Sequence, residues 1–153
     1  MKAHALVVLS AVLLSADAPN TPCHHSSADW AAQEDLSDLQ GSWSIIGLSK
    51  NGVADDLDEW AGCRWVFIGD SVFFEEAGKH RYLVGTVRVD RNQDPPGIDL
   101  IRRRTSRLSP GVCRRTGDTL IWAYTDEPSR RPPALASEPQ SGVVLWTLKR
   151  DNK

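Results

Sequence analysis

Short apolar runs separated by turn residues fill the chain from Gly41 to Arg150, and this pattern constrains the fold most. In the run Arg81–Asp90, the positions of Tyr82, Val84 and Thr86 alternate with those of Leu83, Val87 and Val89, as the two faces of a strand require. Gly69-Asp70 joins two further runs, and its residues favour the positive φ of a tight hairpin turn. We predict eight strands: Ser42–Leu48, Arg64–Ile68, Ser71–Glu75, Arg81–Asp90, Ile98–Arg103, Leu108–Arg115, Thr119–Tyr124 and Gly142–Arg150.

Eight short strands in a chain of 153 residues predict a mainly β domain, an antiparallel barrel or sandwich. Closure into a barrel removes the exposed strand edges, and an eight-stranded barrel holds packed side chains or one small ligand. Short helical segments are expected before the first two strands, at Ala28–Leu39 and Asp55–Ala61. The loops are short except Thr125–Ser141, which is rich in proline.

The amino-terminal residues have the pattern of a secretion signal. Lys2 precedes the uncharged apolar run Ala5–Ala16, and Ala16-Asp17-Ala18 has the small-x-small form of a cleavage site. The run is too short for a transmembrane helix, which needs about 20 apolar residues. We therefore expect a signal peptide (residues 1–18), a flexible tether with the start of a helix (residues 19–33) and a barrel domain (residues 34–153). The mature chain is expected in the periplasm or outside the cell, without a transmembrane segment.

Three cysteines, Cys23, Cys63 and Cys113, allow at most one disulfide within the chain. An oxidising compartment permits such a bridge, and Cys63 with Cys113 is the obvious candidate pair. Whether these two residues pair, and what happens to Cys23, stays open at the level of sequence.

Gly41-Ser42-Trp43 begins a series of motifs that occur in a recognisable order. The later members are Asn51-Gly52, Phe67-Ile68-Gly69-Asp70, Gly85-Thr86-Val87, Pro96-Gly97-Ile98-Asp99-Leu100, Gly117-Asp118-Thr119-Leu120, Arg131-Pro132 and Leu148-Lys149-Arg150. Over Leu36–Arg150 the chain resembles a lipocalin-like (calycin-type) domain family of uncharacterised exported proteins abundant in planctomycetes. The family has no established activity, so the resemblance implies a fold and not a function.

The resemblance implies a structural role for Gly41, Trp43 and Arg150. In calycins the tryptophan of Gly-x-Trp closes one end of the barrel, and an arginine late in the chain packs over it. Such a cation–π contact contributes about 0.5–2 kcal/mol, depending on desolvation. We therefore expect an eight-stranded antiparallel lipocalin-like barrel with Arg150 lying over Trp43.

Four aromatic residues within predicted strands are candidates for a ligand pocket: Tyr82, Trp122, Trp65 and Trp146. On the inner face of a barrel, these rings could stack against a small apolar ligand. They could equally fill the interior completely, and the sequence does not rank the four.

Charged residues give weaker evidence about function than the aromatic residues do. Acidic residues predominate up to Glu76 and basic ones after it, so the two halves are expected to neutralise each other on closure. Arg102-Arg103-Arg104 is interpreted as a solvent-exposed run, and the net charge of −2 argues against a nucleic-acid partner. Asp118 is expected in a turn, and Asp99 is expected to pair with an arginine.

No catalytic or metal-binding motif is evident. Cys23-His24-His25 lacks a second pair of ligands for a structural zinc site. Only His80 among the histidines falls in the predicted barrel, and there is no Gly-x-Ser-x-Gly elbow or phosphate loop. The sequence therefore favours a non-catalytic, cofactor-free binding module for a small apolar ligand. An interaction domain that contacts another envelope protein through Thr125–Ser141, and an enzyme of unrecognised class, are the alternatives.

Overall fold

The computed structural model describes residues 36–152. Their regular structure consists of nine strands and two single 3-10 turns. In chain order the elements are η1 (Ser37–Leu39), β1 (Gly41–Lys50), β2 (Val53–Ala54), η2 (Leu57–Trp60), β3 (Arg64–Ile68), β4 (Ser71–Glu75), β5 (Arg81–Asp90), β6 (Gly97–Arg102), β7 (Leu108–Thr116), β8 (Thr119–Thr125) and β9 (Val143–Arg150).

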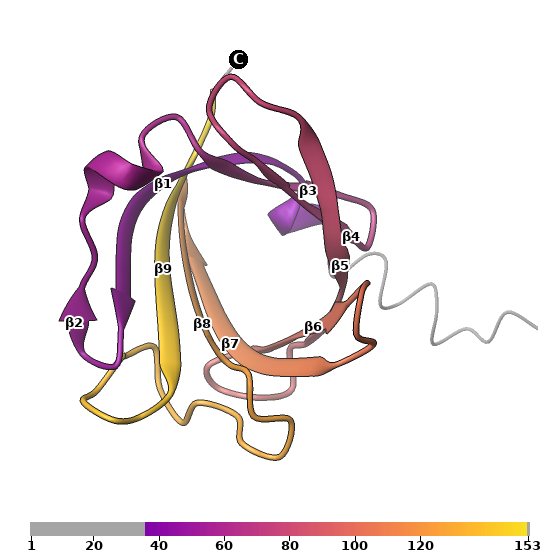
Figure 1. Cartoon of the computed structure of the whole chain (residues 1–153). Coiled ribbons are helices and arrows are strands. Elements are labelled where there is room, and N and C mark those ends of the chain that lie inside the picture. Colours follow the sequence, from indigo (N-terminus) through magenta and orange to yellow (C-terminus); the bar gives the residue numbers. More distant parts are fainter. Residues whose placement is uncertain (1–35, 153) are drawn as a thin grey trace, which may run out of the picture.

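Eight of the strands form a closed antiparallel barrel (Figure 1). From β3 to β9 each strand pairs with the next in the chain, and β1 pairs with both β3 and β9. The closing pair runs from Trp43 opposite Arg150 to Lys50 opposite Val144. The two-residue strand β2, which the sequence did not predict, adds a short hairpin to the end of β1. The prediction of a mainly β, eight-stranded antiparallel barrel is thus confirmed.

Helical structure is limited to the two 3-10 turns in the part of the chain that the structure describes. The end of the segment predicted as helix Ala28–Leu39 is η1, and its earlier residues lie outside the described range, as do the signal peptide and the tether. In a 3-10 turn side chains three residues apart share a face, so Leu36 and Leu39 are both buried against the barrel. Of the short helical segment predicted at Asp55–Ala61, the structure contains only the 3-10 turn η2, which the Asp56 carboxylate caps by accepting from the Asp58 amide.

The interior of the barrel is filled mainly by large apolar side chains. Because alternate residues of a strand face inward, these side chains come from all strands of the barrel except β7, which contributes the smaller Cys113. The largest fully buried ones are Trp43, Trp122, Phe67, Ile98, Leu100, Leu120 and Leu148. Gly111 lies beneath Trp122, where an added Cβ would fall 2.6 Å from the Ala123 oxygen and 3.1 Å from the Trp122 Nε1. Since the Ile98 oxygen would lie only 2.9 Å away as well, the close approach of the backbones of β6 and β8 is the main reason that this position requires glycine.

The proline-rich loop between β8 and β9 packs on the outside of the barrel (Figure 1). Its Leu135 contacts a small second cluster of Val112, Ala123 and Val143. Its Arg131 donates to the Gly111 carbonyl and pairs with the Asp99 carboxylate at 2.7 Å. The expected arginine partner of Asp99 is therefore Arg131. No helix among residues 36–152 is long and apolar enough to cross a membrane.

Candidate functional site

Three of the four aromatic candidates pack against one another in the middle of the barrel. The ring centroid of Trp65 lies 5.3 Å from that of Trp122 and 5.6 Å from that of Trp146, both in T-shaped geometry. The Nε1 atoms of all three indoles have no hydrogen-bond partner within the described part of the chain, and ring edges face ring faces in these contacts. These tryptophans are therefore part of the packed core.

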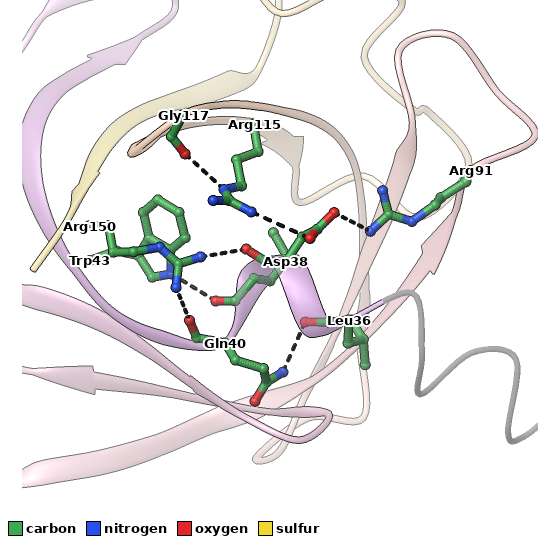
Figure 2. Close-up of polar contacts among 9 residues, drawn as sticks. Leu36, Asp38, Gln40, Trp43, Arg91, Arg115, Gly117 and Arg150 are labelled. Atoms are coloured by element: carbon green, nitrogen blue, oxygen red, sulfur yellow. Dashed lines mark hydrogen bonds and ion pairs between the residues drawn. The ribbon is translucent and has the colours of Figure 1, made fainter. Parts of the chain in front are cut away.

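One end of the barrel is closed by η1, Trp43 and Arg150 (Figure 2). The Trp43 indole donates to the Leu39 carbonyl at 2.7 Å, and the Arg150 Cζ lies 4.4 Å from the centroid of the Trp43 ring. Arg150 also donates to the carbonyls of Asp38 and Gln40, at 2.6 and 2.8 Å. The guanidinium thereby ties the 3-10 turn across the end of the barrel, next to Gly41, which has a φ of 107°.

A concavity of about 420 Å³ lies beside this closed end, lined by Asp38, Leu39, Val89, Arg91, Pro96, Cys113, Arg114, Arg115 and Gly117. Its charges are paired among themselves. The Asp38 carboxylate contacts Arg91 at 3.2 Å and Arg115 at 3.4 Å, and Arg114 contacts Asp94 at 3.0 Å. This pairing joins the acidic and basic halves of the sequence, as their expected neutralisation requires.

Cys113 faces this closed-end concavity, and neither Cys113 nor Cys63 forms a disulfide with another cysteine of residues 36–152. Cys63 lies directly before β3, at the opposite end of the barrel, so closure does not bring the candidate pair together. Burial raises the pKa of the Cys113 thiol from 9.0 to about 11 because it disfavours the thiolate. Cys113 is thus a buried core thiol.

We expect native Cys113 to resist alkylation by iodoacetamide at pH 8. The thiolate is the reactive form, and its burial should slow labelling by at least about 100-fold relative to the unfolded chain. Because the folded pKa is raised, the contribution of Cys113 to stability is complete below pH 9 and is lost as the pH rises toward 11. Peptide mass spectrometry after labelling in buffer and in urea measures the ratio of the two rates. Equal rates in the two conditions would contradict this assignment.

The open end of the barrel carries a second and larger concavity, of about 870 Å³. We call it the mouth pocket, and it is lined by Tyr82, Leu83, Val84, Arg102, Arg103, Arg104 and Thr105. The Tyr82 side chain is 50% exposed, yet its ring contacts the core aromatic Phe74 at a centroid distance of 5.8 Å. The fourth aromatic candidate is therefore separate from the tryptophans and offers a ring face at an opening.

A β-bulge in β5 builds one wall of the mouth pocket. The pairing with β4 skips Val84, because Val72 lies opposite Gly85 and Phe73 opposite Leu83. The Val84 side chain packs against the core, and its carbonyl accepts from the Arg103 amide at 2.8 Å. The bulge thus attaches the turn that carries the arginines to the start of β5.

Arg102, the last residue of β6, lines the mouth pocket but is fixed by contacts with neighbouring side chains. Its guanidinium donates to the Ser109 hydroxyl at 3.1 Å and to the Asp126 carboxylate at 2.7 Å. It also lies over the Tyr124 ring, 5.6 Å from the centroid. The charge of Arg102 is therefore compensated, contrary to the interpretation of the whole arginine run as solvent-exposed.

Arg103 and Arg104 are different, because both are exposed on the turn after β6. Neither side chain forms an ion pair or hydrogen bond with another residue in the described range. Burial raises the pKa of the Tyr82 hydroxyl and Glu76 adds to this effect, whereas the positive charge of Arg104 opposes it. No acidic side chain lines the mouth pocket, so its electrostatic character is cationic.

Asp99 and Asp118 lie where the sequence predicted them. The Asp99 carboxylate pairs with Arg131, and Asp118 lies in the turn between β7 and β8, where its backbone carbonyl accepts from the Arg150 amide at 2.7 Å. Residues 36–152 contain no group of three or more histidine, cysteine or acidic side chains that could hold a metal ion. The Cys23-His24-His25 motif lies outside the described residues.

Comparison with protein-family models, curated proteins and solved structures finds no match to this chain. The choice of the mouth pocket as the candidate site therefore rests on the geometry of this chain alone. Tyr82 is among the ligand-binding residues predicted from the sequence, whereas Val84, Arg103 and Arg104 are lining residues that were not predicted. The signal for the arginines was present in the run Arg102–Arg104, next to a predicted strand end, but the point at which β6 ends decides which of them reach the pocket.

Proposed function

We propose that this chain is a non-catalytic binding module of lipocalin-like type that takes a small molecule with an apolar part in the mouth pocket. The observation that carries the proposal is the half-exposed Tyr82 ring, which continues the aromatic core into a concavity of about 870 Å³. Pockets for small ligands commonly have volumes of about 300–1,000 Å³. An opening of this size with one aromatic wall suits a small cyclic or apolar ligand.

The position of the ligand follows from what the interior already contains. Trp65, Trp122 and Trp146 fill the middle of the barrel, so a ligand among them would have to displace buried rings. The closed end is covered by η1, and its arginines are already paired, Arg91 and Arg115 with Asp38 and Arg114 with Asp94. The mouth pocket, in contrast, combines an exposed ring with two arginines that have no ion pair with any residue of the described range.

The proposal also includes export to the periplasm or the cell exterior. The lysine, apolar run and small-x-small site within residues 1–18 support it, because together they have the pattern of a secretion signal. In that compartment a small β-barrel would meet ligands or other envelope components directly. The loop Thr125–Ser141, which the interaction-domain alternative relies on, turns Leu135 and Arg131 toward the barrel.

Binding of the neutral apolar dye N-phenyl-1-naphthylamine tests this function. We expect saturable fluorescence enhancement with one site per chain, and a Kd raised by about tenfold in Tyr82→Ser, since a lost ring contact costs on the order of 1.4 kcal/mol. Ile68→Ser is the matched control, because Ile68 is 53% exposed and does not line the mouth pocket. Absence of saturable binding, or an equal loss in both variants, would refute the proposed function.

A further inference from the structure

The charge of the mouth pocket points to a narrower class of ligand. We propose that the pocket selects small organic anions, molecules with an apolar ring or chain and a carboxylate or sulfonate group, over neutral compounds of the same shape. This inference rests on the proposed function, since it assigns a chemical class to the same site. It would place the apolar part against Tyr82 and Val84, and the anionic group at Arg103 and Arg104.

The mouth pocket holds uncompensated positive charge. Three guanidinium groups line it, and no carboxylate does. Asp126 neutralises Arg102, whereas Arg103 and Arg104 have no ion pair with a described residue. An anionic ligand would therefore meet two cations without having to displace an acidic side chain.

Besides Asp126, the acidic residues on the chain just before Tyr82 are already engaged in ion pairs. Glu75 at the end of β4 contacts Arg64 at 3.4 Å and Arg81 at 3.0 Å. Glu76 contacts Lys79 at 2.6 Å, on the turn that leads to Tyr82. Because Glu75 and Glu76 already form these ion pairs, they do not neutralise Arg103 or Arg104. These two arginines are therefore able to pair with an anionic ligand.

Arginine side chains also suit an anion with an aromatic part. A guanidinium presents a planar set of donors that matches the two oxygens of a carboxylate, and its flat face packs on aromatic rings. The Arg103 amide is fixed to Val84, and the Ser106 amide donates to the Arg102 carbonyl at 2.8 Å. The backbone of the turn is therefore organised before a ligand binds, which reduces the entropy cost of binding.

A matched pair of ligands isolates the effect of charge. 1-Naphthaleneacetate and 1-naphthaleneacetamide share one ring system and differ mainly in the anionic group. In calorimetric titrations of the full chain at low ionic strength, we expect the carboxylate to bind about tenfold more tightly than the amide, as two partly exposed ion pairs allow. Added salt should reduce this advantage.

The double substitution Arg103→Gln with Arg104→Gln should weaken binding of the carboxylate much more than binding of the amide, so that the ratio of the two affinities falls from about tenfold to about one. Arg107→Gln is the matched control, because Arg107 is exposed on the same turn and does not line the mouth pocket. It should preserve the preference for the anion.

The outcomes separate the two proposals. Equal affinities for carboxylate and amide in the unsubstituted chain would overturn the anion preference while the proposed function stands. An anion preference that persists in the double variant, or is lost equally in Arg107→Gln, would overturn the assignment to Arg103 and Arg104. Failure of both naphthalene ligands and of the neutral dye to bind would defeat the proposed function itself.

Discussion

Replacing Trp43 with alanine is expected to lower the free energy of unfolding by about 3–5 kcal/mol, the range for a large buried ring. The Trp43 side chain is fully buried, its indole donates to the Leu39 carbonyl, and the Arg150 guanidinium covers its ring. Removing the ring leaves a cavity and takes away the surface on which Arg150 and η1 rest. Urea denaturation followed by circular dichroism measures the change, or shows that the variant no longer folds.

Two further substitutions separate the roles of the Trp43 ring. Trp43→Phe keeps most of the apolar volume but loses the hydrogen bond to Leu39, so its loss should be smaller, about 1–2 kcal/mol. Trp60→Ala removes a partly buried tryptophan at the other end of the barrel and should cost less than Trp43→Ala. A loss below about 1 kcal/mol in Trp43→Ala would contradict the closing role of this residue.

Gly85→Ala is expected to destabilise the barrel by about 3 kcal/mol, the upper part of the usual range for overpacking. Gly85 follows the bulged Val84 in β5 and lies opposite Arg102 of β6. A Cβ at this position would fall on the backbone oxygen of Ile101, so the two strands would have to separate. Because the same strands form the wall of the mouth pocket, dye binding should weaken as well.

Gly69→Ala is the control for this substitution. Gly69 has a φ of 60°, and a Cβ added there would have no other atom within 4 Å, so alanine meets backbone strain without a clash. Such strain costs about 1–2 kcal/mol, and dye binding should be unchanged. Equal losses of stability in Gly85→Ala and Gly69→Ala would show that the close approach of β5 and β6 is not the cause.

The barrel could be predicted from the sequence because each strand is marked by a pattern of residues within its own segment. The pattern of Arg81–Asp90 and the turn at Gly69-Asp70 lie within the segments they define. The strand and the turn both appear in the structure, but the bulge at Val84 interrupts the alternation of the strand. The strand β2 was missed because two residues carry no periodicity. The contact of Arg150 with Trp43 was expected through the family resemblance, since periodicity does not pair residues at the two ends of a domain.

The mouth pocket was harder to predict because it depends on where each side chain lies along its strand and on the residue at which β6 ends. The four aromatic candidates were equivalent in sequence, but Tyr82 lies at the end of a strand and the three tryptophans lie mid-barrel. Strand alternation extended through Arg103 would have divided the arginines between two faces. In the structure β6 ends at Arg102, so Arg103 and Arg104 belong to a turn and both line the pocket.

Ligands are expected to bind at the mouth pocket and not among the interior tryptophans. The most direct test is a ¹H–¹⁵N NMR titration of the chain with 1-naphthaleneacetate. Binding at the mouth predicts shifts of the backbone amides of residues 82–84 and 102–105, with the indole resonances of Trp122 and Trp146 unmoved. Shifts concentrated on those indoles, or on Asp38 and Arg115 at the closed end, would contradict binding at the mouth pocket.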